Sequence, residues 1–386
     1  MHQERRIAIV GADEADEIGI VPGKSALMLQ AEAARNALRD AGLSFADVDG
    51  VFTTGFGTGW APSMSFAEYV GIVPRYTDST ATGGSAFVIM VEHAVAALEL
   101  GLCNVALIVH GENGYSGRHL PRPSRVPDPW TPAGQFEAPF GAGGPAGMYA
   151  MAAMRHMAVY GTTSEQLAEV AVSTRRWAQL NPKALKREPL TIADVLASRW
   201  IAYPLHLLDC CLVTDAGGAV VLTTADRARG CRKPPVWVLG TGEAHTHNSL
   251  IGMPDLTVSP AKISGELALA RAGVRREDID VLEVYDSFTY TVIVTLESLG
   301  FCGPGEGGPF VEGGRLGPGG ALPTNTSGGG LSYTHSGMFG IFLLIEAVRQ
   351  LRGECGARQV ANARLALCNG TGGFLSSCGT VILGRD

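Results

Sequence analysis

The sequence predicts an α/β fold with five layers, α/β/α/β/α, in which one unit occurs twice and the first copy carries a long loop excursion. Short β-branched runs alternate with helical patterns, which is typical of sheets covered by helices. The helix expected over residues 86–98 is so apolar that it should be buried on all sides, between layers. A constant offset of 231 residues separates Ala41 from Ala272 and Asp47 from Asp278. Helix ends and turns repeated at one offset indicate an internal duplication.

The first copy is expected to begin with a buried strand at residues 6–11, RIAIVG, a β-branched run closed by glycine. Alanines and leucines at helical spacing predict a helix over 26–41, which the sequence AGL ends. A strand is expected at 51–54. Residues 83–101 form a small-residue turn that leads into a long apolar helix, and a buried strand follows at 105–109.

The second copy repeats this order. Its helix also ends in an AG pair, and the turn RREDID stands where the first copy has SFADVD. We therefore place the two halves at residues 1–230 and 231–386. The matching elements are a helix at 263–272, a strand at 281–284, a turn with a buried helix at 336–353 and a strand at 363–367.

Residues 111–205 interrupt the pattern of the first half. The segment 121–145 is rich in proline, glycine and aromatic residues and is interpreted as a loop, and helices are expected at 144–160 and 164–180. An excursion of this length is expected to cover the active site. After it, residues 207–223 should return to the core as a strand that follows an Asp-Ala-Gly-Gly turn.

The composition argues against several classes of function. The chain has 386 residues, 17% of them charged, and a net charge of −7, and no cluster of Lys and Arg suggests a nucleic-acid interface. The eight cysteines are scattered without a zinc-binding spacing, so no metal site is expected, and their usage fits a reducing compartment. The N-terminus resembles no signal peptide and no stretch is long enough for a membrane span. We expect a cytoplasmic protein without membrane contact.

The stretch NTSGGGLSYTHSGMFG at residues 325–340 combines groups suited to chemistry. Three consecutive glycines allow the backbone to pass close to a ligand. His335 can act as an acid, a base or a hydrogen-bond donor near neutral pH, and Tyr333 adds a phenol two residues away. The apolar run that follows predicts a helix, whose N-terminus favours negative charge. A glycine-rich turn with a structural histidine is the alternative interpretation.

Five features in this order resemble the thiolase superfamily over nearly the whole chain. They are the duplication, TDAGGAVVLT at 214–223, VYDSF at 284–288, GGGLSYTHSG at 328–337 and CNGTGG at 368–373. The resemblance implies a thiolase fold, in which loops from the two halves converge on an acyl-CoA thioester. Coenzyme A would then belong to the substrate, and the resemblance implies no separate cofactor and no metal.

The position of the family's nucleophilic cysteine, at the start of the buried helix of the first half, falls on Gly84. A shifted alignment would place Thr80 or Ser85 there, and no register supplies a cysteine. Glycine cannot attack a thioester, and a hydroxyl does so only beside an activating base. We expect Gly84 and Ser85 at the substrate site without a covalent intermediate, with Ser85 as a small packing residue or helix cap.

Other parts of the family's site have counterparts. His335 matches the histidine of the Gly-His-Pro motif, although Ser336 replaces the proline, and the resemblance implies that it holds the thioester oxygen. Cys368 matches the cysteine of the Cys-x-Gly motif, an acid or base in relatives; a buried, inert thiol is the alternative. Tyr285 stands where relatives carry Asn or His. Three glycines of these loops are expected beside the substrate: Gly329, Gly330 and Gly370.

Tyr285 and Tyr333 suggest a reaction that needs no acyl-enzyme. A phenol has a pKa of about 10, and a nearby cation or donor can lower that pKa until the phenol takes a proton from a hydroxyl. A β-hydroxyacyl-CoA would then undergo retro-aldol cleavage to a thioester enolate, stabilised by His335 and backbone N–H groups. The missing cysteine and the Tyr-x-His loop resemble the steroid side-chain aldolases of the superfamily, which work with an OB-fold and zinc-ribbon partner. The Ser-Gly pair after His335 departs from their pattern.

Two other functions stay open at this point. One is a Claisen-type thiolase or acetyl-CoA acyltransferase that uses Cys368 and His335. The other is a non-catalytic acyl-CoA-binding subunit, although a purely structural subunit needs no polar groups converging on one loop. The resemblance also implies a homodimer, with residues 77–80 and 105–109 as candidate contacts. Candidates for binding the CoA phosphates or adenine lie in the excursion: Arg118, Arg122, Arg125, Arg175, Arg176, Lys183, Lys186, Trp177 and Trp200.

Overall fold

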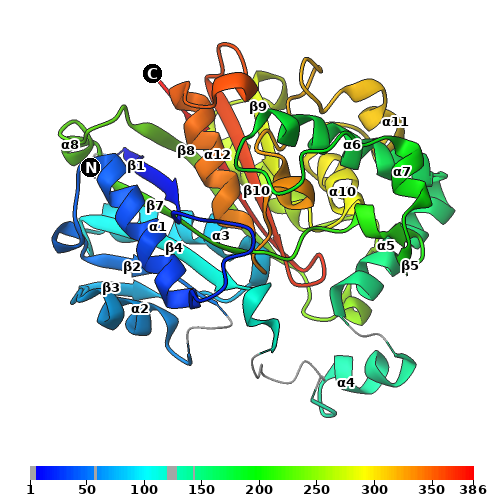
Figure 1. The fold of residues 1–386 in the computed structure, drawn as a ribbon, viewed down its shortest axis with the longest axis horizontal. Coiled ribbons are helices and arrows are strands. Elements are labelled where there is room, and N and C mark those ends of the chain that lie inside the picture. The colour runs from blue at the N-terminus through cyan, green and yellow to red at the C-terminus, as the bar shows by residue number, and fades with distance from the viewer. Residues whose placement is uncertain (1–5, 56–58, 120–127, 142–143) are drawn as a thin grey trace.

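The computed structural model describes residues 6–55, 59–119, 128–141 and 144–386. Within them, a nine-stranded mixed sheet has the order β3-β2-β4-β7-β1-β8-β11-β10-β9, and β5 and β6 form a separate hairpin (Figure 1). The strands are β1 (Ile7–Glu14), β2 (Gly50–Phe52), β3 (Tyr76–Asp78), β4 (Val105–Asn113), β5 (Trp200–Ala202), β6 (Leu205–His206), β7 (Asp215–Thr224), β8 (Val236–His245), β9 (Val281–Val284), β10 (Leu365–Gly372) and β11 (Ser377–Gly384). The α-helices are α1 (Ala26–Ala41), α2 (Pro62–Val70), α3 (Ala86–Glu99), α4 (Pro132–Phe136), α5 (Gly144–Tyr160), α6 (Ser164–Leu180), α7 (Ile192–Ala197), α8 (Ala225–Ala228), α9 (Ala261–Ala272), α10 (Thr289–Leu299), α11 (Gly307–Val311) and α12 (Gly340–Arg352).

The order of the strands repeats in the two halves of the sheet. From the centre outward, one half runs β1-β7-β4-β2 and the other runs β8-β11-β10-β9. In each half the first two pairings are antiparallel and the third is parallel. The halves join where β1 meets β8 through the pairs Ala8–Trp237 and Ile9–Val236. The predicted duplicated fold is confirmed, while the chain position that divides the halves stays a prediction.

Helices α3 and α12 form the middle layer of the molecule. Helix α3 contacts β4 and β7 of the first half and β10 and β11 of the second, and α12 likewise contacts strands of both halves. Figure 1 shows α12 at the centre of the molecule. Helix α1 covers the outer face of the first half, and α9 covers that of the second. Because α3 is enclosed by the two half-sheets, every residue of its first turns, 86–91, is buried and apolar.

The repeated turn has the same structural role in both halves. Asp49 Oδ1 accepts hydrogen bonds from the backbone N–H groups of Asn104 and Val105 at 2.7 and 2.8 Å. Asp280 Oδ2 accepts them from Arg364 and Leu365 at 2.8 and 2.9 Å. Each aspartate therefore fixes the start of the strand that lies beside its own turn, β4 in one half and β10 in the other.

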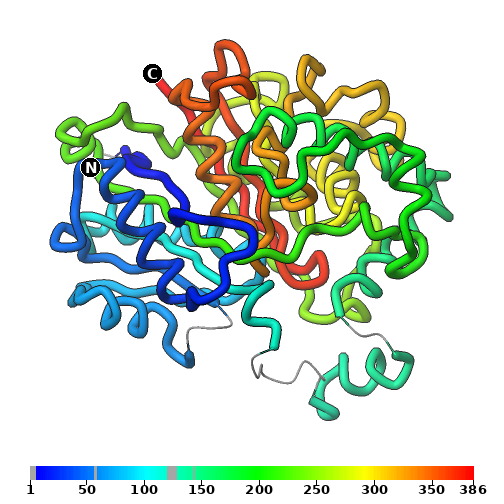
Figure 2. Tube along the Cα trace, in the orientation of Figure 1, coloured from blue at the N-terminus to red at the C-terminus, as the bar shows by residue number. Residues whose placement is uncertain are grey.

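The excursion packs on the second half of the chain, as the green segments beside the yellow ones in Figure 2 show. Its helices α5 and α6 have the predicted bounds. His156 of α5 donates from Nε2 to the carboxylate of Glu297 of α10 at 3.0 Å, and both side chains are buried. The predicted loop over 121–145 lies partly outside the described residues, and its described part contains the short helix α4.

The sequence predicted a turn at the Asp-Ala-Gly-Gly segment. That prediction is wrong, because the segment forms the first part of strand β7. A Cβ on Gly217 would lie 2.4 Å from the carbonyl oxygen of Leu29, so glycine allows α1 to pack directly on the strand. The buried carboxylate of Asp215 accepts hydrogen bonds from the N–H groups of Val21, Tyr115 and Ser116. The motif therefore joins three segments of the first half.

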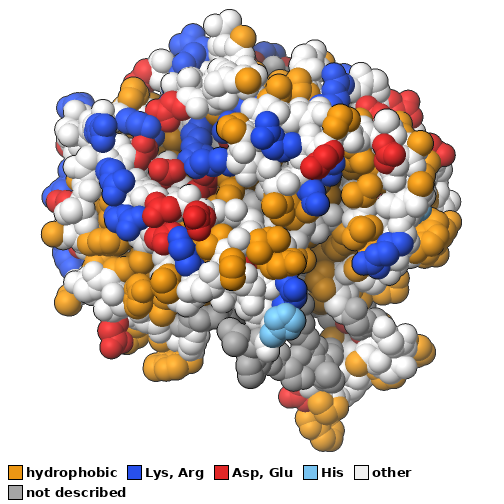
Figure 3. All heavy atoms as spheres, viewed as in Figure 1, with side chains coloured by type: hydrophobic (Ala, Val, Ile, Leu, Met, Phe, Trp, Pro, Cys, Tyr) orange, Lys and Arg blue, Asp and Glu red, His pale blue; other side chains and the backbone are white. Residues whose placement is uncertain are grey.

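The surface shown in Figure 3 intersperses Lys and Arg with Asp and Glu, and this face presents no stripe of a single charge. Within the described part of the chain, no helix combines the length and the apolarity that a bilayer crossing requires. No group of His, Cys, Asp and Glu in the same residues is arranged to hold a metal ion.

Candidate functional site

Tyr285 follows strand β9, and its ring lies against Gly84, just before helix α3. A Cβ on Gly84 would be 2.3 Å from a ring carbon of Tyr285 and 2.5 Å from the carbonyl oxygen of Thr371. These distances are shorter than any van der Waals contact, so only glycine fits beside this tyrosine. The place that the resemblance assigns to a nucleophilic cysteine is therefore occupied by an aromatic ring.

The hydroxyl of Tyr285 is hydrogen-bonded to His335. The distance from Tyr285 Oη to His335 Nε2 is 2.9 Å, and the N–H of Phe339 donates to the same phenol oxygen at 3.1 Å. Burial lowers the pKa of His335 to about 4, so the imidazole is neutral at pH 7. With the phenol oxygen accepting from Phe339, the consistent arrangement is that the phenol donates its proton to Nε2.

The expectation of a lowered phenol pKa is wrong for both tyrosines. Burial raises the pKa of Tyr285 well above 10, and the nearby Cys211 adds to that effect. Burial also raises the pKa of Tyr333, and the carboxylate of Glu14 raises it further. Both phenols are protonated at neutral pH, so neither is a resting phenolate base.

Tyr333 has a different partner from Tyr285. Its hydroxyl donates to Glu14, at the end of β1, and Arg349 of α12 donates to the same oxygen. Lys183 of the excursion donates to the other oxygen at 2.6 Å. Burial opposes ionisation of Glu14, but Arg349 and Lys183 outweigh it and lower its pKa to about 2. The structure thus brings Tyr285, His335 and Gly84 together and joins Tyr333 to an ion-paired cluster.

Cys368 and the remaining predicted residues lie in packed surroundings. Cys368 is fully buried beside α12, and its Sγ lies 3.6 Å from the carbonyl oxygen of Leu343. Burial and the neighbouring Glu283 raise its pKa well above 9, so it stays a thiol. Ser85 is buried and shares a hydrogen bond with Ser377 Oγ at 2.8 Å, and a Cβ on Gly370 would be 3.0 Å from the Cα of Ser85. These contacts favour the packing interpretations of Ser85 and Cys368.

Several candidates for the CoA phosphates are engaged within the protein. Arg175 donates to Ser332 Oγ at 2.8 Å and to the carbonyl oxygen of Glu188, and Lys183 binds Glu14. The indole of Trp177 is buried and donates to the carbonyl of Leu316, whereas Trp200 stacks on His206 with ring centroids 3.6 Å apart and is half exposed. Arg122 and Arg125 lie outside the described residues. The CoA-binding role stays a prediction for Arg118, Arg176 and Lys186.

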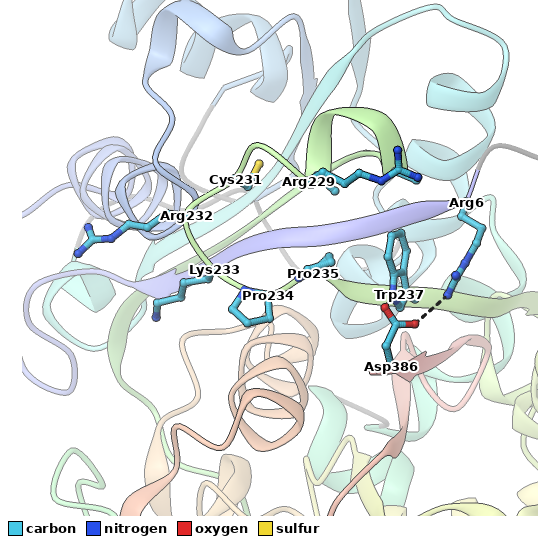
Figure 4. Close-up of a pocket in the computed structure, with 11 residues that line it drawn as sticks. Arg6, Arg229, Cys231, Arg232, Lys233, Pro234, Pro235, Trp237 and Asp386 are labelled. Carbon is cyan, nitrogen blue, oxygen red and sulfur yellow. Dashed lines mark hydrogen bonds and ion pairs between the residues drawn. The ribbon is translucent and has the colours of Figure 1, made fainter.

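A basic surface cavity of about 560 Å³ lies apart from these residues. It is lined by residues of the segment before β8, by Arg6 and by the C-terminal Asp386, and contains no predicted site residue. Figure 4 shows that its cations diverge: Arg232 and Arg229 point in opposite directions, and Arg6 is paired with Asp386. The arrangement does not converge on a single ligand position.

Two buried polar residues beside the glycine-rich loop escaped the prediction from sequence. Asp286, directly after Tyr285, accepts hydrogen bonds from the glycine-rich loop, and only its place in VYDSF gave a signal. His110 of β4 is buried, with Nε2 3.0 Å from Ser336 Oγ, and burial lowers its pKa to about 3. His110 thus shares a hydrogen bond with the serine that follows His335, where the family has proline.

Known proteins share this architecture along its whole length. The family model described as "Thiolase C-terminal domain-like" matches residues 242–385. The 17-hydroxy-3-oxo-4-pregnene-20-carboxyl-CoA lyase of Mycobacterium tuberculosis is 37% identical over 363 residues, 90% of this chain and 91% of that protein. A steroid side-chain-cleaving aldolase of Thermomonospora curvata is 35% identical over 98% of this chain and 97% of its own. The solved structure of an "Ltp2-ChsH2(DUF35) aldolase" has a TM-score of 0.88 and 33% identity, and the match covers 99% of this chain and 98% of that one.

The chain is therefore a thiolase-fold protein and belongs to the thiolase superfamily. Within it, the relatives of highest identity named above are an acyl-CoA lyase and an aldolase, with nearly the full length in common.

Proposed function

We propose that this enzyme cleaves a β-hydroxyacyl-CoA by retro-aldol chemistry and that Tyr285 and His335 are its reacting pair. The enzyme is a carbon–carbon lyase that acts on acyl-CoA thioesters. One observation carries the assignment of residues: a tyrosine fills the place of the family's nucleophile, with its hydroxyl 2.9 Å from a neutral histidine. That pair can move a proton, but it offers no thiolate for an acyl-enzyme.

The proposed reaction begins with transfer of one proton along a relay. The β-hydroxyl of the substrate gives its proton to Tyr285 Oη as the phenol passes its own proton to His335 Nε2. The electron pair of the O–H bond forms the new carbonyl, the Cα–Cβ bond breaks, and its electrons form the thioester enolate. The imidazolium then returns the proton through Tyr285 to Cα, which releases a shorter acyl-CoA and a ketone or aldehyde. A relay of two positioned, buried groups is a form of general acid–base catalysis.

The hydrogen bond from Phe339 N–H supports this role of Tyr285. It reaches the phenol oxygen at 3.1 Å and stabilises that oxygen as it gains negative character during the transfer. The pKa of about 4 for His335 keeps Nε2 free to accept at neutral pH. Burial of the pair also makes the imidazolium a short-lived species that readily gives its proton back.

The substrate and partners can be proposed from the relatives. The names of the two most similar proteins given above describe steroid CoA thioester and side-chain cleavage, so we propose a steroid β-hydroxyacyl-CoA as substrate. The name of the matching aldolase structure includes a second component, ChsH2, and we propose that this chain also works with an OB-fold and zinc-ribbon subunit and forms a homodimer. The proposal requires no further cofactor, and it keeps the expectation of a cytoplasmic enzyme.

The test is turnover of a steroid β-hydroxyacyl-CoA by the purified chain, alone and with such a partner, before and after treatment with iodoacetamide. We expect equal molar amounts of carbonyl product and shorter acyl-CoA, and no loss of activity after alkylation. A Cys368→Ala variant should keep that turnover. If alkylation or Cys368→Ala abolishes activity and acetoacetyl-CoA is cleaved instead, the Claisen alternative replaces this proposal; if the thioester binds without turnover, the binding-subunit alternative does.

A further inference from the structure

Asp286 connects strand β9 to the glycine-rich loop. Its side chain is fully buried, Oδ1 accepts the N–H of Gly330 at 2.7 Å, and Oδ2 accepts the N–H of Leu331 at 3.1 Å. Both carboxylate oxygens are thus bound to successive amides of one short helical turn, Gly329–Tyr333. A carboxylate held this way fixes both the distance and the orientation of the segment that it binds.

The glycines of this loop pack on the carboxylate of Asp286. A Cβ on Gly329, whose φ is +56°, would lie 2.1 Å from Oδ2. A Cβ on Gly330 would lie 3.1 Å from Oδ1 on one side and 3.1 Å from Cδ2 of His335 on the other. Gly330 therefore lies close to both Asp286 and the imidazole, and a side chain at this position fits only if one of them moves by a few tenths of an ångström.

The far end of the loop is held by Thr214. The N–H of His335 donates to Thr214 Oγ1 at 2.9 Å, and the N–H of Thr214 donates to the carbonyl of His335 at 3.1 Å. Asp286 holds the near end, and it is adjacent in sequence to Tyr285. The same carboxylate therefore links the strand that carries the phenol to the loop that carries the imidazole.

We propose that Asp286 is a positioning residue whose ionised carboxylate sets the distance between Tyr285 Oη and His335 Nε2. This inference rests on the proposed function and deepens it. Asp286 transfers no proton itself. A displacement of about 1 Å between reacting groups is enough to reduce turnover on the order of 100-fold, so the two hydrogen bonds to the loop matter for the rate.

The ionisation of Asp286 gives the proposal a signature in the pH profile. Burial raises its pKa to about 7, although the amides of Gly330 and Leu331 counteract that rise. The titratable side chains facing it in the described structure are Cys211, Glu283, Tyr285 and His335, and none is a cation at neutral pH. Turnover should therefore fall as the pH drops below about 7 and Asp286 takes up a proton. Protonation of His335, whose pKa is about 4, would reduce turnover only at a much lower pH.

The test compares Asp286→Asn with Asp209→Asn. Asp209 is a matched control, because it is a buried aspartate with a raised pKa that binds the N–H of His206 and the hydroxyl of Thr289 but does not contact the loop. For Asp286→Asn we expect kcat to fall about 10- to 100-fold, with KM changed less than about twofold. Its pH profile should lack the acid limb near 7, whereas Asp209→Asn should keep it. Wild-type kcat together with a retained acid limb in Asp286→Asn would overturn the proposal.

Hydrogen exchange separates this inference from the proposed function. In Asp286→Asn the amides of residues 328–335 should exchange faster than in the wild type, and this readout needs no substrate. If the wild type has no lyase turnover, the proposed function fails, and exchange alone decides whether Asp286 holds the loop. Unchanged exchange in these amides would refute the inference.

Gly330→Ala provides a second variant should Asp286→Asn not fold. It keeps the carboxylate and adds a methyl group 3.1 Å from both Asp286 Oδ1 and His335 Cδ2, so one of the two must move by a few tenths of an ångström. We expect a lower kcat with the acid limb retained. Wild-type kcat in this variant would show that the spacing is not critical and would overturn the proposal.

Discussion

Tyr285 and Tyr333 are similarly buried, with exposed fractions of 4% and 2%. Their hydroxyl groups differ in their partners, which are neutral for Tyr285 and charged for Tyr333. Tyr285 donates to a neutral imidazole and accepts a hydrogen bond from a backbone amide. Tyr333 donates to Glu14, whose charge is balanced by Arg349 and Lys183. A phenol beside a neutral imidazole can pass its proton on as it receives another from the substrate, whereas a proton held between a phenol and a strongly acidic carboxylate stays on the phenol.

This difference assigns separate roles to residues that look equivalent in sequence. The pKa of about 2 for Glu14 makes it a poor base for Tyr333. The pKa of about 4 for His335 also disfavours transfer from Tyr285 at rest, but His335 is neutral and can accept as negative charge leaves the substrate oxygen. We infer that Tyr285 moves protons and that Tyr333 anchors the loop.

Replacing each tyrosine by phenylalanine tests this comparison with the largest expected effect. Tyr285→Phe removes the relay oxygen and keeps the ring against Gly84, so kcat/KM should fall by about 10² to 10⁴-fold, the usual contribution of a general acid–base group. Turnover of a β-hydroxyacyl-CoA, measured by release of the shorter acyl-CoA, checks it. The same variant leaves His335 Nε2 and the N–H of Phe339 without this partner, so the free energy of unfolding should also fall by roughly 1–3 kcal/mol.

Tyr333→Phe is the matched control. It removes one oxygen from the ion-paired cluster, and we expect turnover within about tenfold of wild type, with roughly 1–3 kcal/mol lost from the free energy of unfolding because Glu14 loses a partner. If Tyr333→Phe were the inactive variant and Tyr285→Phe the active one, the two roles would have to be exchanged.

Gly84→Ala tests whether the ring of Tyr285 needs the space beside α3. The added methyl group would lie 2.3 Å from the ring, so Tyr285 must move and its bond to His335 must lengthen. We expect turnover to fall about 10- to 100-fold and the unfolding free energy to fall by about 1–3 kcal/mol, as for other overpacked cores. The double variant Gly84→Ala/Tyr285→Phe should be no less active than Tyr285→Phe alone, and a further loss would show that Gly84 acts independently.

The fold could be predicted from the sequence. So could three of the residues that the structure brings together. The duplication is visible because helix ends, turns and strands recur at a fixed spacing, and spacing is a local property. Gly84, Tyr285 and His335 were each identified through motifs. That the ring of Tyr285 occupies the space beside Gly84 depends on how β9 meets α3, and no motif encodes that contact.

Contacts between segments far apart in the chain are what the sequence did not show. Glu14 and Tyr333 are 319 positions apart, and nothing in either neighbourhood indicates that they meet. A nearby cation or donor was expected to lower the phenol pKa, but Arg349 and Lys183 bind Glu14, and burial dominates the pKa of both phenols. Cys368 lies at the expected place on β10, yet its side chain faces α12 in the core.

Glu14→Gln tests whether the charge on Glu14 stabilises the surroundings of Tyr333. We expect a smaller effect on turnover than in the variants above, and an effect on stability that depends on pH. Because the folded state lowers the pKa of Glu14 from 4.5 to about 2, Glu14 contributes stability that is complete above pH 4.5 and is lost as the pH falls toward 2. That contribution is roughly 3 kcal/mol at pH 7. Glu14→Gln should therefore unfold more readily at pH 7 in denaturant titrations, and its stability should change less than that of the wild type between pH 5 and pH 2.

Glu283→Gln supplies a control of opposite sign. Burial and the neighbouring Glu346 raise the pKa of Glu283 well above 4.5, so its contribution to stability is present at low pH and is lost as the pH rises. This variant should be as stable as the wild type at pH 7 or more stable, while Glu14→Gln is less stable. Equal stability losses in the two variants would mean that the charge on Glu14 does not hold Tyr333, and Tyr333 would then have to be considered again as a proton-transfer group.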